Sequence, residues 1–205
     1  RTSLGGAPEV VRLCVIVEGQ TEEAFVDDVL APYLWGAEVF AYSRLLATSP
    51  RTRGGVTTYA KAQRDVLDSI HADPTARFTT MLDLYGLPEE WPGVQETRDV
   101  PDVHDRIEVI EEAFAQDIGD RRFIPYIQVH EFEALVLSDP RALLEAHPDA
   151  VGAVADLQAA VADCGGPELV NDGADTHPAK RIADAIPLYR KTLSGLSAAR
   201  AIGIG

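Results

Sequence analysis

The chain has 205 residues, of which 46% are hydrophobic and 25% are charged, a composition typical of a folded soluble protein rather than a disordered one. Its formal net charge of −15 disfavours a broad basic surface for nucleic acid, although bound divalent cations or a basic partner would offset it. No apolar run approaches the ~20 residues that span a bilayer, and no signal-peptide pattern opens the chain. Two cysteines make no disulfide framework, so we predict a cytoplasmic protein.

Strand and helix patterns alternate along the first two thirds of the sequence. The expected elements are a strand over 13–17, a helix from Thr21 that Pro32 ends, a helix over 59–70, a strand over 77–83, a helix over 105–118, and a strand from 121 that turns near His130 into a short helix. Strands joined by long crossovers predict an α/β fold with a mostly parallel sheet flanked by helices.

The domain organisation follows from a change of character near Pro140. We expect residues 1–10 to be a disordered or vector-derived tail, and 11–205 to form one α/β domain. From about residue 140 the sequence is Ala-rich and then polar with one more helical segment, which predicts a helical C-terminal extension.

Each of the three expected strands ends in a carboxylate: Glu18, Asp83, and either Glu131 or Glu133. Ligands of open α/β sheets bind outside the carboxyl ends of the strands, so these acids are expected to converge there. Converging carboxylates repel one another unless a cation lies among them. Carboxylate oxygens suit Mg²⁺ or Mn²⁺, which leave coordination positions for a substrate phosphate. The pattern therefore predicts metal-assisted phosphodiester chemistry.

Structural roles compete with this interpretation. Glu18-Gly19 is also what a tight turn needs, with Thr21 as helix N-cap and Glu22 and Glu23 complementing the helix dipole. Asp83 is also a common turn residue. Glu131 and Glu133 share a face in a strand and point nearly apart in a helix. Because the helix is expected to begin here, we expect only one of the pair to face the site.

Basic residues gather late in the chain, in "HPAKRIADAIPLYRK", which holds Lys180, Arg181, Arg190 and Lys191. Lys180 and Arg181 begin a helix, where backbone amides and two cations would bind a phosphate; a solvated helix face is the alternative. Earlier, Arg51 and Arg53 beside two glycines indicate either a phosphate-contacting loop or a plain connection. Asn171 and Thr176 fit loop and cap positions.

The segments "VIVEGQTEEAF", "MLDLYGLP", "YIQVHEFEALVLSDP" and "THPAKRI" with "YRKTLSG" together resemble the DUF4276 family over most of the chain. The family is generally regarded as similar to Toprim domains, the α/β metal-binding unit of topoisomerases, primases and OLD-type nucleases. Its members often lie beside ATPases in bacterial, phage-defence-like gene clusters. The resemblance thus implies a Toprim-like fold.

The resemblance also implies roles for single residues. Glu18 matches the first-strand Toprim glutamate, a metal ligand or general acid/base, and Asp83 matches the first acid of the Toprim Asp-x-Asp pair. Tyr85 stands in place of the second acid, so Glu133, with Glu131, would supply the missing ligand. Glu22 lies one helical turn from Glu18 and is either a further ligand or a surface residue.

Two functions follow as expectations. The first is a Toprim-like nuclease that depends on Mg²⁺ or Mn²⁺, with DNA or RNA as substrate and an ATPase as partner in a defence system. In it Glu18, Asp83 and Glu133 are catalytic and hold the metal, Glu131 or Glu22 assists with the metal, and Lys180 or Arg181 binds phosphate. The second is a non-catalytic Toprim-like module that binds an ATPase or a nucleotide.

Overall fold

The computed structural model describes residues 10–46, 58–170 and 177–204. The predicted roles of Arg51, Arg53, Asn171 and Thr176, and nearly all of the predicted tail, lie outside these residues. The elements are β1 (Val11–Val17), α1 (Gln20–Phe25), the π-type turn η1 (Val26–Leu30), α2 (Ala31–Trp35), β2 (Val39–Leu45), α3 (Tyr59–Ala72), β3 (Arg77–Asp83), η2 (Leu84–Gly86), α4 (Val103–Ile118), β4 (Ile127–Gln128), α5 (Glu133–Val136), η3 (Pro140–Glu145), α6 (Val151–Cys164), η4 (Pro167–Leu169), α7 (Pro178–Ala185), η5 (Lys191–Gly195) and α8 (Leu196–Ile202).

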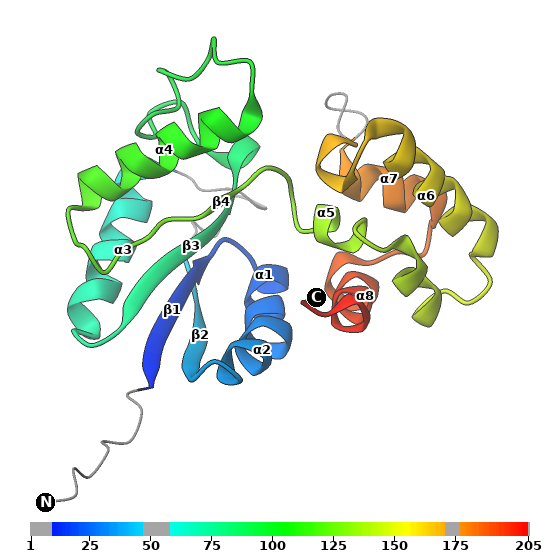
Figure 1. Cartoon of the computed structure of the whole chain (residues 1–205), viewed down its shortest axis with the longest axis horizontal. Coiled ribbons are helices and arrows are strands. Elements are labelled where there is room, and N and C mark those ends of the chain that lie inside the picture. The colour runs from blue at the N-terminus through cyan, green and yellow to red at the C-terminus, as the bar shows by residue number, and fades with distance from the viewer. Residues whose placement is uncertain (1–9, 47–57, 171–176, 205) are drawn as a thin grey trace, which may run out of the picture.

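The described strands form a four-stranded sheet in the order β2-β1-β3-β4, and every pairing is parallel. Helices α3 and α4 cover one face, and α1 and α2 cover the other, with α5 to α8 beside them (Figure 1). The predicted α/β class, parallel sheet and helical C-terminal extension are confirmed.

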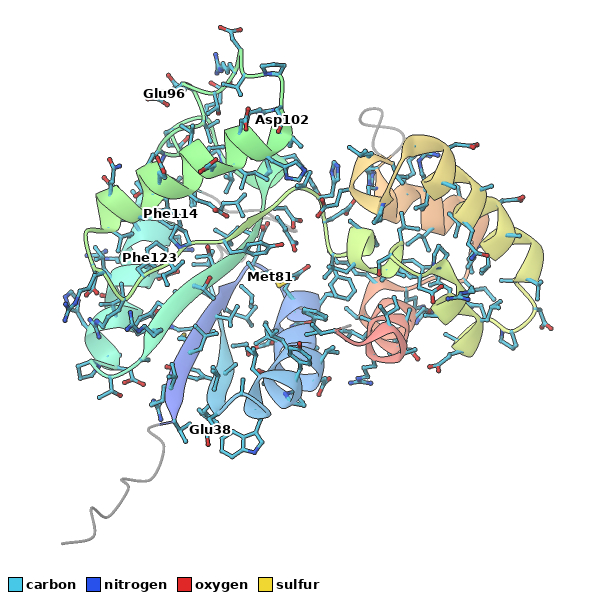
Figure 2. The ribbon with its side chains drawn as sticks, in the orientation of Figure 1. Glu38, Met81, Glu96, Asp102, Phe114 and Phe123 are labelled. Atoms are coloured by element: carbon cyan, nitrogen blue, oxygen red, sulfur yellow. The ribbon has the colours of Figure 1, made fainter. Side chains whose placement is uncertain are left out.

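Two apolar clusters lie on the two faces of the sheet. On the first face, Phe114 of α4 and Phe123 make an edge-to-face contact at 4.9 Å between ring centroids, and Trp91 packs on Phe114 at 4.8 Å. On the second, Met81 packs with residues of α1, η1 and α5 to α8. Figure 2 shows Met81 on the side of the sheet opposite to Phe114. The second cluster therefore joins the C-terminal helices to the sheet.

Strand β2 was not predicted from the sequence. It pairs with β1 in parallel, from Val11 opposite Val39 to Val17 opposite Leu45. Within the described residues its other edge has no partner strand, and Phe40 and Leu45 are exposed. A strand covered on one side carries a weaker apolar pattern than the buried β1.

The expected end of the first helix at Pro32 is wrong. Helical structure continues through η1 and α2 to Trp35. Pro32 is the second residue of α2 and closely follows the π-type turn over 26–30, in which the Ala31 N–H bonds to the Val26 carbonyl, so the helix passes the proline through a locally wider turn.

The third expected strand is much shorter than its apolar pattern. Only Ile127 and Gln128 form β4, with one isolated parallel bridge between Phe78 and Phe123. Pro125 lies between the two pairings and cannot donate to the ladder, which interrupts the strand.

None of the helices in the described parts of the chain has the length and apolar character needed to cross a membrane.

Candidate functional site

Glu18 follows the last residue of β1 and directly precedes the turn into α1. Gly19 is the N-cap of α1, in an extended conformation and without a side-chain cap, so the prediction of Thr21 as N-cap is wrong. A Cβ at Gly19 would lie 2.7 Å from Oε2 of Glu22, so the end of the Glu22 side chain would have to shift to make room for it. Glu22 is thus folded back over the turn and is only 6% exposed, which contradicts the interpretation of Glu22 as a surface residue.

Asp83 ends β3, beside Glu18 across the sheet edge. A Cβ at Gly86 would lie 3.7 Å from both carboxylate oxygens of Glu18, which places Glu18 over the turn that follows Asp83. Gln128, opposite Asp83 in the β3–β4 register, donates from Nε2 to Oδ1 of Asp83. The Tyr85 hydroxyl donates to Oδ2 at 3.4 Å. Tyr85, in the position expected for a second acid, therefore contacts the first.

The pKa of the Asp83 carboxyl is raised above its ordinary value. Burial is the main cause, and the negative charges of Glu22 and Glu131 add to it. The hydrogen bond from Gln128 and the charge of Lys191 act in the opposite direction. The like charges that were expected to repel one another at the sheet edge therefore act on the carboxyl group of Asp83.

Glu131 lies just before α5 and reaches the beginning of α7. Its Oε1 accepts from His177 Nδ1 at 2.5 Å and from the Ala179 backbone N–H at 3.3 Å. Glu131 thus connects the sheet edge to α7. Two residues on, Glu133 is 0% exposed and accepts a hydrogen bond from the Tyr189 hydroxyl at 3.2 Å.

Lys191, the first residue of η5, is the cation of this region. Its Nζ lies 3.1 Å from Oε1 of Glu22 and 3.4 Å from Oε2 of Glu133. Burial alone would lower the pKa of Lys191, but the charges of Glu133 and Glu22 outweigh it and raise that pKa above its ordinary value. Burial likewise raises the pKa of Glu133, while Lys191 counteracts the increase.

These side chains meet at one cleft of about 490 Å³ at the carboxyl edge of the sheet. The residues that line it are Glu18, Gly19, Gln20, Thr21, Glu22, Asp83, Tyr85, Gly86, Glu131 and Lys191. Of the predicted site residues, Glu18, Asp83, Glu22 and Glu131 line the cleft, and Glu133 lies buried behind Lys191.

The structure brings neither predicted phosphate ligand to the lining of this cleft. Lys180 forms an ion pair with Asp184 one turn further along α7, at 2.8 Å, and Arg181 lies on the same helix. Sequence reasoning noticed Lys191 only as one of four late basic residues and missed Gln128. Lys191 directly follows the "YR" of the fourth motif, but only the fold shows which cation meets the acids.

The donor chemistry of the cleft fits a hard divalent cation, because carboxylate oxygens are its main polar groups. The ammonium of Lys191 lies between Glu22 and Glu133. In the conformation shown, the described residues contain no group of three or more His, Cys, Asp or Glu side chains arranged to hold a metal ion. Four acids, Glu18, Glu22, Asp83 and Glu131, nevertheless line the same cleft.

The fold and the cleft define an α/β protein with buried acids at the carboxyl edge of a parallel sheet. The sequence matches the model of the family described as "Domain of unknown function (DUF4276)" over residues 17–205, and the chain belongs to this family. Comparison with curated proteins found no match.

Two solved structures of the C-terminal region of the Xanthomonas campestris pv. campestris OLD protein are similar to this chain. The structure phased with iodine has 17% sequence identity and a TM-score of 0.33, and the structure phased with mercury has 16% and 0.35. Each match covers 94% of this chain and 96% of the other. Similarities at this level support no conclusion about the activity of this chain.

Proposed function

We propose that this protein is a Toprim-like hydrolase of phosphodiester bonds, a nuclease that depends on Mg²⁺ or Mn²⁺. The observation that carries the proposal is the cleft itself. Carboxylates that follow two neighbouring parallel strands, Glu18 and Asp83, line it together with Glu22 and one ammonium group. Acids crowded at this edge have no structural need for one another, since their repulsion destabilises the fold.

Glu18, Asp83 and Glu22 would hold the metal, with Glu131 and Glu133 as the remaining acids of the site. A bound Mg²⁺ or Mn²⁺ supplies a Lewis acid for a phosphoryl oxygen and an activated water. Gln128 and Tyr85 orient the Asp83 carboxylate through their hydrogen bonds. Glu131, paired with His177, keeps α7 against the edge of the cleft.

A phosphate group that binds here needs a cationic side chain that is accessible in the cleft beside these acids. Lys191 has that position, because it lines the cleft and its side chain remains 35% exposed. It replaces Lys180 and Arg181 in our proposal as the group that contacts substrate phosphate. The net charge of −15 makes a partner with a basic surface useful for holding DNA or RNA. An ATPase partner in a bacterial defence system, implied by the resemblance, is part of the same proposal.

A second function is favoured by specific observations. Lys191 already pairs with Glu22 and Glu133, and a tyrosine stands where a second aspartate would extend the metal site. A non-catalytic module that binds an ATPase or a nucleotide needs only a cleft of this kind, in which Lys191 already neutralises part of the negative charge. Metal-dependent turnover separates the two functions.

The test is Mn²⁺ calorimetry on the wild type and on Glu18→Gln and Asp83→Asn, with plasmid and single-stranded DNA cleavage measured on the same samples. Glu96→Gln is the matched control, since Glu96 is an exposed acid of the segment before α4 (Figure 2) and is not among the residues that line the cleft. Binding and cleavage that are lost in both cleft variants and kept in the control support the nuclease. Binding without cleavage supports the module, and absence of binding in the wild type overturns the metal site.

A further inference from the structure

The Lys191 ammonium connects three separate parts of the chain. Lys191 begins η5, Glu22 lies on α1 next to β1, and Glu133 begins α5. The ion pair with Glu22, at 3.1 Å, therefore fastens η5 to α1 at the cleft, and the pair with Glu133, at 3.4 Å, fastens it to α5. The Lys191 ammonium also lies 6.0 Å from the centroid of the Phe132 ring.

The backbone that carries Lys191 is fixed independently of these ion pairs. The Ser194 hydroxyl lies 2.8 Å from His147 Nε2 and accepts from the Arg190 backbone N–H at 3.4 Å. A Cβ at Gly195 would lie 2.6 Å from the Tyr189 hydroxyl oxygen, so η5 packs closely on its surroundings. Movement of the lysine side chain consequently requires no movement of η5.

The three charged groups differ in access to water. The side chains of Glu22 and Glu133 are 7% and 1% exposed, whereas the side chain of Lys191 is 35% exposed. A lysine carries its charge on a flexible four-carbon stem and reaches solvent by rotation alone. The cation is thus the member of the group that can leave, while the carboxylates stay buried.

The carboxylates cannot be left without a counter-charge. Removing one partner of a buried ion pair leaves an uncompensated charge in a poorly solvated place, which is strongly destabilising. Asp83 and Glu131 increase the negative potential further, since the charge of Asp83 acts on Lys191 and the charge of Glu131 acts on Glu133. If the lysine leaves, a proton or another cation has to take its place.

We propose that Lys191 is the resident counter-ion of Glu22 and Glu133 in the metal-free protein, and that a divalent cation entering the cleft displaces its ammonium. The inference rests on the proposed function for its metal but not for any cleavage step. It assigns to the C-terminal region a direct part in the site: metal entry breaks the tie between η5 and α1 and turns the lysine towards the cleft, where a phosphate would meet it.

The first experiment measures Mn²⁺ affinity by calorimetry for the wild type, Lys191→Met and Arg190→Met. Arg190 is exposed and precedes Lys191 in the chain, so Arg190→Met removes one positive charge but leaves the ion pairs of Glu22 and Glu133 intact. If metal and lysine compete, Lys191→Met binds Mn²⁺ roughly tenfold more tightly than the wild type, and Arg190→Met stays close to the wild type.

The second experiment observes the lysine directly. The sequence has three lysines, Lys61, Lys180 and Lys191, so ¹⁵N-lysine labelling gives few ammonium signals, and Lys191→Met assigns its own. An ammonium held in two ion pairs with buried carboxylates exchanges its protons more slowly than one on an exposed side chain. We expect the Lys191 signal in the metal-free protein and its loss at saturating Mg²⁺, with Lys61 and Lys180 unaffected.

Displacement is overturned if Lys191→Met binds Mn²⁺ no more tightly than the wild type or Arg190→Met, or if the Lys191 ammonium signal persists in the Mg²⁺ complex. These outcomes are independent of DNA cleavage. A protein that binds metal by displacing the lysine and cleaves nothing would retain the inference and lose the nuclease. A protein that cleaves with Lys191 still paired would do the reverse.

Discussion

Ion pairs lie at both ends of the same sheet, and they differ in how far their carboxylates are buried. At the amino end, Arg12 of β1 pairs with Asp73 at 2.7 Å, with side chains that are 46% and 20% exposed. At the carboxyl end, Lys191 pairs with two glutamates that are almost completely buried. Exposed pairs contribute little because water and salt screen them, and a buried pair rarely improves on apolar side chains of similar volume. The amino-end pair is ordinary surface chemistry. The carboxyl-end cluster is costly, which points to function.

The contrast between the two ends of the sheet is tested most directly by replacing the cation of each ion pair with methionine. We expect Lys191→Met to lower the free energy of unfolding by about 3 kcal/mol, at the lower end for a broken buried pair because the lysine is partly exposed. Arg12→Met, which removes a solvent-screened pair, should change it little. Urea unfolding without divalent metal measures both.

The control for this prediction is the double variant Lys191→Met with Glu133→Gln. Removing the buried charge together with its partner should recover part of the stability, because less uncompensated charge remains. Equal losses for Lys191→Met and Arg12→Met would show that burial does not distinguish the two ends.

The second prediction concerns Gln128, which holds Asp83 across β3 and β4. Gln128→Leu removes a hydrogen bond that favours the ionised Asp83 carboxylate, so the pKa of Asp83 should rise further. We expect Mn²⁺ affinity to fall about 10- to 100-fold, as when the hydrogen-bond partner of a metal ligand is lost. Calorimetry measures it, with Gln95→Leu, at an exposed position, as the control. Unchanged affinity would remove Asp83 from the metal site.

A matched pair of glycines tests how tightly the acids are packed. Gly19→Ala places a Cβ 2.7 Å from Oε2 of Glu22, whereas Gly86→Ala makes only ordinary contacts at 3.7 Å with Glu18. The backbone at Gly19 is extended and tolerates alanine, so any effect comes from displacing the carboxylate. We expect Gly19→Ala to cost about 1 kcal/mol of stability and Gly86→Ala less. Thermal unfolding of both variants decides, and the reverse order would contradict the packing described for Glu22.

The buried strands and the acids that follow them are predictable because both signals are local. The apolar runs of β1 and β3 and the positions of Glu18 and Asp83 are visible in the sequence. Strand β2 is not, since an edge strand shows a weaker pattern, and the helix through Pro32 depends on a π-type turn with no clear sequence signal.

The cation of the site illustrates what local patterns leave out. Lys180 and Arg181 begin a helix after a proline, which is a recognisable local signal for phosphate binding. Lys191 begins an irregular turn, and its importance comes from contacts with Glu22 and Glu133, both distant in the chain. Only the packing of η5 against α1 and α5 identifies it.

The smallest expected effect is the change in melting temperature that low pH produces through Asp73, at the amino end of the sheet. The Thr75 hydroxyl, and then Arg12, hold the pKa of Asp73 down at about 2, below its ordinary value of 3.8. A carboxyl whose pKa is lowered in the folded state contributes stability above its unfolded pKa and loses it as the pH falls through the folded one. The wild type should therefore exceed Asp73→Asn slightly in melting temperature above pH 4, and the two should converge as the pH falls towards 2. Asp68→Asn, at an exposed position of α3, is the control. A difference as large at pH 2 as at pH 4 would mean that Asp73 acts through its shape rather than its charge, and the contrast between the two ends of the sheet would lose its electrostatic basis.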